Sequence, residues 1–389
     1  KICGIVLVIR CIVAALFYFV KRNKDEGKIG TGALVGKLIG NVCIIVTCLV
    51  PALLFTGYNG FKTGGPYEVK TAEAILIDGE RIEKFEKDGS MREVPVYFYY
   101  PDTEEGKFPL IIFSHGAFGY YQSNSSTYME LASRGYVVVS MDHPYHSFFT
   151  KDTAGKLVTV NPDFINSVTA INQEDVSEEE VFACASEWVE LRKGDMNLAI
   201  NSIKEASEKG ELSDAWYTAD EKEIILGVIN ITDCDKIGVM GHSLGGAEAV
   251  YIGRTRDDIG AVIDLDGSML SERLDIEGDH YVYSKDPYPV PVLTIDNEEH
   301  YELGAEMGNL YVNHYVVENA IDGHSTYFKG SEHMNFTDLP MFSPFLARML
   351  GTGSIDSESC IRQTNDIVLM FFDYYLKDKG ELTLKEYYQ

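Results

Sequence analysis

Residues 241–246, with the sequence Gly-His-Ser-Leu-Gly-Gly, constrain the fold of this chain more than any other feature. They follow the apolar run 236–240 and precede a helix-like stretch at 247–256. A Gly-x-Ser-x-Gly motif between a strand and a helix is typical of a nucleophile elbow, a sharp turn that lifts a serine hydroxyl above a sheet. Both glycines are needed because side chains there would collide with the neighbouring strand and helix. The motif therefore predicts that Ser243 is a nucleophile at a helix start, where the helix dipole and free N–H groups favour negative charge.

Strand-like and helix-like segments alternate on both sides of this motif. Short apolar runs bounded by turn residues predict strands at 93–100, 110–113, 136–141, 236–240, 261–265, 290–295 and 326–329. An amphipathic run predicts a long helix at 359–377. This alternation favours an α/β fold with a mostly parallel central sheet and crossover helices.

A long segment at about 150–232 interrupts the alternation before the strand that leads to Ser243, and we interpret it as an insertion. Two capping boxes predict helix starts within it, one at 177–180 and one at 218–221. An insertion at this side of such a sheet often forms a wall of the active site.

The first 57 residues contain two apolar segments. Residues 38–55 carry no charge, and residues 2–20 carry only Arg10. Runs of this length can span a bilayer, so we predict two transmembrane helices, the alternative being a pair of buried core helices. The basic linker between them is predicted to be cytoplasmic by the positive-inside rule. We therefore expect a multi-pass cell-membrane protein, anchored through its N-terminal helices, with a catalytic domain at 58–389 on the extracellular side. Because the chain starts at Lys1, we also expect residues upstream.

Charge and cysteine content narrow the classes of partner. A formal net charge of −27 argues against nucleic acid as a partner, because like charges repel. The seven cysteines show no Cys-x-x-Cys spacing, which argues against a zinc site and against a disulfide framework. We expect no metal and no organic cofactor, and the sequence indicates no oligomeric state.

A serine nucleophile needs a base, and the base needs a carboxylate that holds its tautomer. In this type of fold the order along the chain is serine, acid, histidine. His333 is the candidate base because it lies in a loop after the last predicted strand. Asp266 and Asp296 both end predicted strands beyond Ser243, and the residues alone leave the choice of acid open. His115 and His242 are interpreted as structural residues.

An oxyanion hole needs two N–H donors directed at the developing negative charge. The backbone N–H of Leu244, directly after the nucleophile, is the first candidate. The segment formed by Gly116 and Ala117, in the loop after the strand 110–113, is the candidate for the second donor.

Four motifs in the right order resemble the plasma-type platelet-activating-factor acetylhydrolase family, a branch of the α/β-hydrolase superfamily. They lie at 113–116, 131–136, 236–243 and 330–336. The resemblance implies that the acid is Asp266, in a Leu-Asp dipeptide after the nucleophile helix, and that Ala117 is the second oxyanion donor. It also implies a calcium-independent hydrolase that removes short or oxidised acyl groups from the sn-2 position of phospholipids. The chain departs from the family pattern in its apolar N-terminal segments, its long acidic insertion and Leu244.

We therefore expect a serine carboxylic-ester hydrolase of α/β-hydrolase fold that acts on a lipid or other short-chain ester through an acyl-enzyme. Two alternatives remain at this point. One is an esterase of the polyester or cutinase type that uses Asp296, and the other is an inactive hydrolase fold that serves as a binding module.

Overall fold

The computed structural model describes residues 31–171, 173, 176–219, 221–277 and 280–389. The chain divides into two compact units. One unit contains the residues up to Asn59 together with Leu339–Leu350, and the other contains Gly60–Asp338 and Gly351–Gln389.

The described part of the first unit is helical. It contains α2 (Thr31–Leu54), α10 (Leu339–Phe342) and α11 (Pro344–Leu350). The backbone N–H of Thr56 donates to the carbonyl of Phe342 at 3.0 Å.

The prediction of a membrane-spanning helix at 38–55 is wrong, and with it the expected location in the cell membrane. Within the described residues, no helix combines the length and the apolar character that crossing a bilayer requires. The sequence prediction rested on the absence of charge between residues 38 and 55, whereas α2 begins at Thr31, includes Lys37 and contains Pro51 inside the helix. The other predicted span, 2–20, and most of the linker lie outside the described residues.

The second unit is built on one ten-stranded sheet. Seven strands run parallel to one another, and β1, β2 and β7 form an antiparallel edge. In spatial order the strands are β14 (Tyr387–Tyr388), β13 (Gly323–Phe328), β12 (Val292–Asn297), β9 (Ile259–Leu265), β8 (Thr232–His242), β3 (Phe108–Ser114), β4 (Val137–Met141), β2 (Met91–Pro101), β1 (Val69–Ile82) and β7 (Trp216–Tyr217). The predicted mostly parallel sheet is confirmed.

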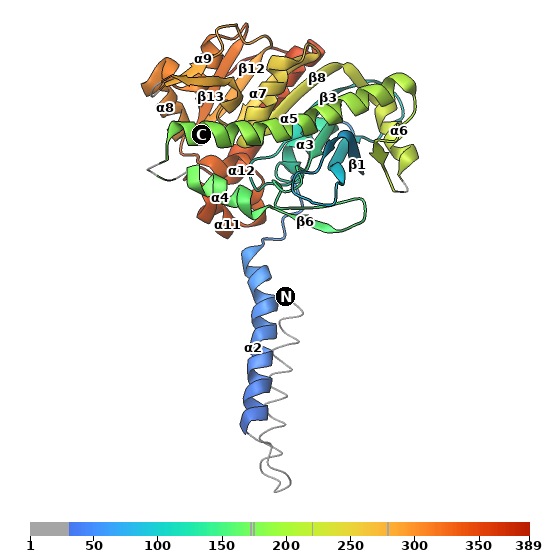
Figure 1. The fold of residues 1–389 in the computed structure, drawn as a ribbon, viewed down its shortest axis with the longest axis vertical. Helices are drawn as coiled ribbons and strands as arrows, with labels where there is room; N and C mark the ends of the chain where they lie inside the picture. Colours follow the sequence, from blue (N-terminus) through green and yellow to red (C-terminus); the bar gives the residue numbers. More distant parts are fainter. Residues whose placement is uncertain (1–30, 172, 174–175, 220, 278–279) are drawn as a thin grey trace. The chain divides into compact units, whose positions relative to one another are not determined.

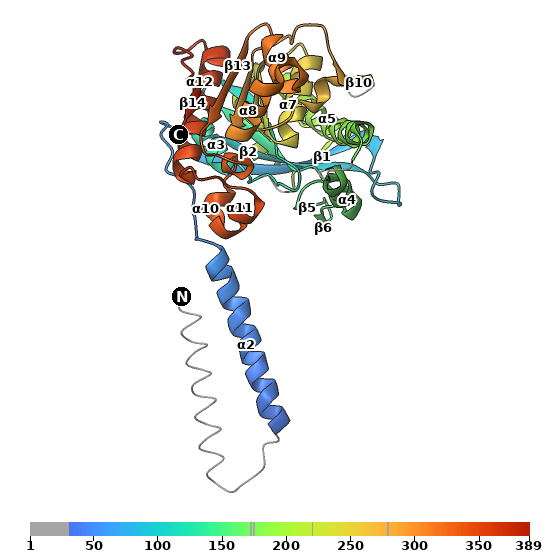
Figure 2. The same cartoon turned by 90° about the vertical axis from the view of Figure 1, so that its left-hand side faces the viewer.

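Helices cover both faces of this sheet (Figure 1). One hydrophobic cluster joins the sheet to α5 (Glu178–Lys209), α6 (Lys222–Ile231), α7 (Leu244–Thr255) and α9 (Val312–Glu318). The second cluster joins the opposite face to α3 (Ser125–Ser133) and α12 (Ser357–Lys377). Figure 2 shows α12 and α3 on one side of the strands and α5 on the other.

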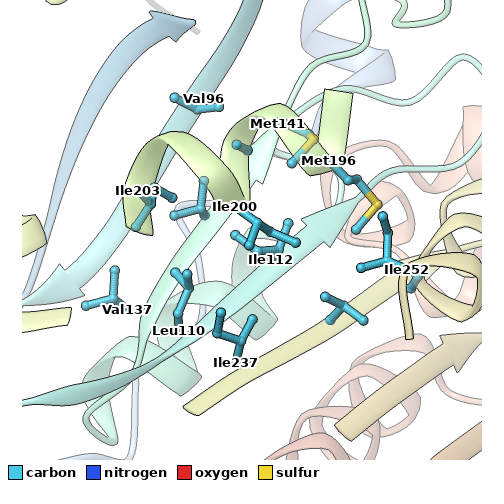
Figure 3. Packing of buried hydrophobic residues seen from close by; sticks show 14 of the residues in the cluster. Val96, Leu110, Ile112, Val137, Met141, Met196, Ile200, Ile203, Ile237 and Ile252 are labelled. Atoms are coloured by element: carbon cyan, nitrogen blue, oxygen red, sulfur yellow. The ribbon is translucent and has the colours of Figure 1, made fainter. Parts of the chain in front are cut away.

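Helix α5, from the insertion, lies over the centre of the sheet. Its Met196, Ile200 and Ile203 belong to one cluster with Ile112 and Ile237 of the strands, and Figure 3 shows Ile200 directly over Ile112. The predicted capping box at its start is confirmed, because the Ser177 side chain and Glu180 exchange hydrogen bonds. The capping box predicted at 218–221 is wrong, since α6 begins after Glu221 without a side-chain cap.

Shorter elements complete the second unit. The insertion also holds the hairpin β5–β6 (Phe149–Lys151, Leu157–Thr159) and α4 (Pro162–Ile171). Beyond the nucleophile helix lie η1 (Leu270–Glu272), the hairpin β10–β11 (Arg273–Glu277, His280–Tyr283), α8 (Glu298–Met307), η2 (Gly308–Leu310) and η3 (His333–Phe336). Because β3, β8, β9 and β12 are parallel, the loops that follow them meet at one edge of the sheet.

Candidate active site

Ser243 lies between β8, which ends at His242, and α7, which begins at Leu244, as the sequence predicts. Its backbone has φ 56° and ψ −124°, an unfavourable conformation for a residue with a side chain. A Cβ on Gly241 would lie 2.1 Å from the carbonyl oxygen of Gly245, and a Cβ on Gly245 would lie 2.0 Å from that of Ser114. Only glycine fits at these two positions, and the tight packing around them holds the serine in its strained turn.

The loop after β3 lies against this turn. A Cβ on Gly116 would lie 3.1 Å from Cβ of Ser243, so the loop backbone borders the serine directly. Among the residues that the structure describes, none accepts a hydrogen bond from the backbone N–H of Ala117 or from that of Leu244. Both N–H groups are therefore available to a negatively charged oxygen, as expected of oxyanion donors.

Contacts on the Gly116 carbonyl fix the direction of the Ala117 N–H. Nδ1 of His115 lies 2.6 Å from this oxygen, and Nη2 of Arg192 donates to it at 3.4 Å. Nη1 of Arg192 also donates to the carbonyl of His115 at 2.6 Å. In a trans peptide the N–H points opposite to the C=O, so the Ala117 N–H faces away from Arg192.

Arg192 is fully buried and comes from α5 in the insertion, and it was not among the predicted site residues. Its Nε lies 3.4 Å from Oε1 of Glu248 and donates to Nδ1 of His146 at 3.2 Å. Burial raises the pKa of Glu248 to about 8, although the attraction of Arg192 opposes that shift. The loop that carries Ala117 is thus braced by a buried cation.

His333 and Asp266 meet above the sheet. Nδ1 of His333 lies 2.7 Å from Oδ2 of Asp266. Asp266 follows β9 directly, with φ 50°, and His333 opens η3 after β13. The carbonyl of His333 lies 3.2 Å from Nε2 of His242, the residue before Ser243, and the two imidazole rings are 4.6 Å apart. The candidate base, the candidate acid and the elbow therefore occupy the same edge of the sheet.

The hydrogen bonds to Asp266 favour its ionised form. Burial alone would raise its pKa, but hydrogen bonds from His300 and His333 outweigh burial and hold the pKa well below the ordinary value. The backbone N–H of Asn297 donates to Oδ1 at 2.7 Å, and its side-chain amide donates to Oδ2 at 2.9 Å. A carboxylate fixed in this way can hold one imidazole tautomer and stabilise the imidazolium.

Asp296, the alternative acid, has a different environment. It accepts a hydrogen bond from Thr294 at 2.8 Å, and among the described residues it makes no hydrogen bond with His333. Burial and the nearby charge of Asp266 raise its pKa to about 7. Burial also raises the pKa of Asp264 well above its ordinary value. Of these three neighbouring carboxyl groups, Asp266 keeps its charge most firmly.

His300 is a second histidine in contact with Asp266, and it was not among the predicted site residues. Its Nδ1 lies 2.9 Å from Oδ1, the carboxylate oxygen that His333 does not contact. The hydrogen bond to Asp266 raises the pKa of His300 to about 9. His300 lies in the first turn of α8, where a histidine close to Asn297 has no motif that would single it out.

An apolar cluster borders the candidate oxyanion residues. Phe164 of α4 and Trp188 of α5 pack in one cluster with Leu244, and the partly buried Ala117 and Phe118 adjoin it. The insertion therefore forms an apolar wall beside the candidate site.

Comparisons with known proteins agree with this geometry. Residues 85–385 match the family model described as platelet-activating factor acetylhydrolase, isoform II. The platelet-activating factor acetylhydrolase of the dog, Canis lupus familiaris, is 25% identical over 276 residues, which cover 69% of this chain and 57% of the relative. The bovine protein of the same name, from Bos taurus, is 26% identical with the same coverage, so the chain spans less than two thirds of these relatives.

A solved structure supports the fold. A ferulic acid esterase from Streptomyces cinnamoneus superimposes with a TM-score of 0.58 at 18% identity, covering 82% of this chain and 93% of that one. At this identity the likeness concerns the fold alone, and it agrees with the predicted α/β-hydrolase type. Because the family model covers most of the chain, from just before β2 to just beyond α12, the chain belongs to the family of platelet-activating factor acetylhydrolase, isoform II.

Proposed function

We propose that this chain is a serine ester hydrolase that removes short or oxidised sn-2 acyl groups from phospholipids or cleaves similar short-chain esters. The observation that carries the proposal is the 2.7 Å contact between His333 and the ionised Asp266, on the sheet edge where Ser243 occupies a strained elbow. Family membership supports the ester chemistry, and the names of the relatives support the lipid substrate.

The chemistry would proceed through an acyl-enzyme. The Ser243 hydroxyl attacks the ester carbonyl while His333 accepts its proton, and Asp266 stabilises the resulting imidazolium. The N–H groups of Ala117 and Leu244 bind the oxyanion of the tetrahedral intermediate. When this intermediate collapses, His333 returns the proton to the departing alcohol. A water molecule then loses a proton to His333 and attacks the acyl-enzyme. When the second tetrahedral intermediate collapses, His333 returns this proton to the Ser243 oxygen and the carboxylic acid leaves.

The apolar wall supports an acyl substituent of limited size. Phe164 and Trp188 lie in edge-to-face contact, with ring centroids 5.5 Å apart, and Phe118 packs on Phe164 at 5.2 Å. Aromatic side chains next to the oxyanion donors would accept a short alkyl chain and leave little room for a long one. We therefore expect hydrolysis of p-nitrophenyl esters to decline as the acyl chain lengthens, with short-acyl phosphatidylcholine preferred to its long-chain counterpart.

The identity of the acid is the sharpest test of the mechanism. Asp266→Asn should lower kcat by about 10⁴-fold, because the amide would hold the wrong tautomer of His333. Asp296→Asn is the matched control, being an isosteric change of a buried neighbour that should leave kcat within a few-fold. If Asp296→Asn caused the large loss and Asp266→Asn did not, the esterase alternative that uses Asp296 would replace this proposal. If neither change reduced hydrolysis, the triad itself would be refuted.

A further inference from the structure

His300 forms a second histidine contact on the candidate acid. Oδ1 of Asp266 lies 2.9 Å from Nδ1 of His300 and accepts a hydrogen bond from the backbone N–H of Asn297 at 2.7 Å. Oδ2 contacts Nδ1 of His333 and accepts a hydrogen bond from the side-chain amide of Asn297. Because Asp266 is buried and His300 and His333 use opposite oxygens, the carboxylate lies clamped between two imidazoles.

The local structure holds His300 in place. Asn297 caps α8, and its side-chain oxygen accepts the backbone N–H of His300 at 2.8 Å. A cation in the first turn of a helix opposes the helix dipole, so its charge must be balanced locally. The ionisable groups around His300 come from β9, the residue after β9, β12, α8 and η3: Asp264, Asp266, Asp296, Glu299 and His333.

We propose that His300 is a positioning residue that orients the Asp266 carboxylate and, through its positive charge, repels the proton that His333 accepts during catalysis. This inference rests on the proposed function, since it assigns Asp266 and His333 their roles. The two imidazole rings have centroids 6.3 Å apart. A proton on His300 therefore repels the proton that His333 takes from the serine, and it partly neutralises the carboxylate that stabilises the imidazolium. Without His300, the proton on His333 would be bound more tightly.

The direction and size of the effect follow from this separation. For two charges 6.3 Å apart and an effective dielectric constant of about 20, Coulomb's law gives an upper limit of about two pH units. Both rings are partly exposed, and solvent screening reduces the expected shift to about one unit. The acidic limb of kcat/KM, which reports the base in the free enzyme, should therefore move to higher pH when His300 is removed.

The test is the pH profile of kcat/KM for p-nitrophenyl acetate in the full chain. His300→Asn keeps a neutral donor near the position of Nδ1, so its acidic limb should move up by about one unit, with the plateau within about threefold. At pH values on this limb the variant should be about tenfold slower than the native enzyme. His300→Ala, which also loses the donor, should in addition lower the plateau. His324→Gln is the control, because His324 lies at the opposite end of β13 and contacts Tyr375.

An acidic limb that stays in place, or moves down, in His300→Asn would overturn the inference, as would equal profiles for the His300 and His324 variants. Ser243→Ala distinguishes a failure of the role proposed for His300 from a failure of the proposed function. If it is inactive while His300→Asn has a native profile, only the role of His300 fails; if it still hydrolyses the ester, the proposed function fails as well. NMR of the histidine imidazoles in the native enzyme measures the protonation state of His300 without any substitution. His300 should remain protonated at pH 8, and a neutral His300 at pH 7 would contradict the inference.

Discussion

Arg192 offers a demanding prediction, because it acts on the reaction only through the backbone of a loop. The change Arg192→Lys keeps a positive charge in the buried site but removes the planar pair of donors that reaches both His115 and Gly116. The peptide between Gly116 and Ala117 should then be less firmly oriented, and the Ala117 N–H should meet the oxyanion less well.

The size of the effect can be bounded from the structure. Losing one oxyanion donor completely costs about 2.7–4 kcal/mol, or about 10²–10³ in kcat. In Arg192→Lys, His115 still holds the Gly116 carbonyl at 2.6 Å, so only part of this loss is expected. We expect kcat for p-nitrophenyl acetate to fall about 10- to 100-fold with little change in KM, because the donor acts mainly in the transition state.

A matched control variant distinguishes the loss of orientation of the Ala117 N–H from a general loss of protein stability. Arg92 is also buried, and it pairs with Asp195 at 2.6 Å and with Glu83 at 2.8 Å. Arg92→Lys should lower the melting temperature to a similar degree, since it also disturbs the contacts of a buried guanidinium, while kcat of the folded fraction stays near the native value. The reasoning would be refuted if Arg192→Lys had native kcat, or if both variants lost kcat in proportion to their loss of stability.

Two further predictions concern the framework of the site. Gly245→Ala should strongly destabilise the fold and abolish activity, because the new Cβ would lie 2.0 Å from the Ser114 carbonyl oxygen. Gly227→Ala, at an open position in α6, should instead stabilise the fold by up to about 1 kcal/mol. Thermal unfolding measures both variants, and equal effects would contradict the packing argument. Glu248→Gln should stabilise the protein increasingly as the pH rises from about 4.5 to about 8. Burial raises the pKa of Glu248 to about 8, so the native state binds more protons than the unfolded state in this range and loses stability with rising pH. Unfolding curves at pH 5 and pH 8 measure the difference, and an equal effect at both would contradict it.

Much of the second unit was predictable because its parallel strands are buried on both faces and appear as short apolar runs. The strands at 110–113 and 261–265 lie within β3 and β9. The strand β1 (Val69–Ile82) was missed because it lies near the antiparallel edge and carries exposed charged residues, such as Glu73 between its buried positions and Glu80 beyond them. The apolar run at 38–55 illustrates the opposite error, in which lack of charge was taken for the character of a membrane span.

The residues of the candidate site also differ in how far the sequence alone could predict them. The elbow around Ser243 is local in sequence, so its glycines and the oxyanion donor Leu244 could be read directly. Asp266 and Asp296 look alike in sequence because each ends a strand. What separates them is the contact with His333, which Asp266 makes although the two residues are 67 positions apart in the chain. Arg192 was not predictable at all, because its role depends on α5 packing over the loop after β3.

The most direct test of the central claim is covalent labelling with a fluorophosphonate, followed by mass spectrometry of the peptides. Native enzyme and Asp296→Asn should carry one adduct on Ser243, His333→Ala should label far more slowly, and Ser243→Ala should not label. Labelling at another residue, or ester hydrolysis that survives in Ser243→Ala, would contradict the account.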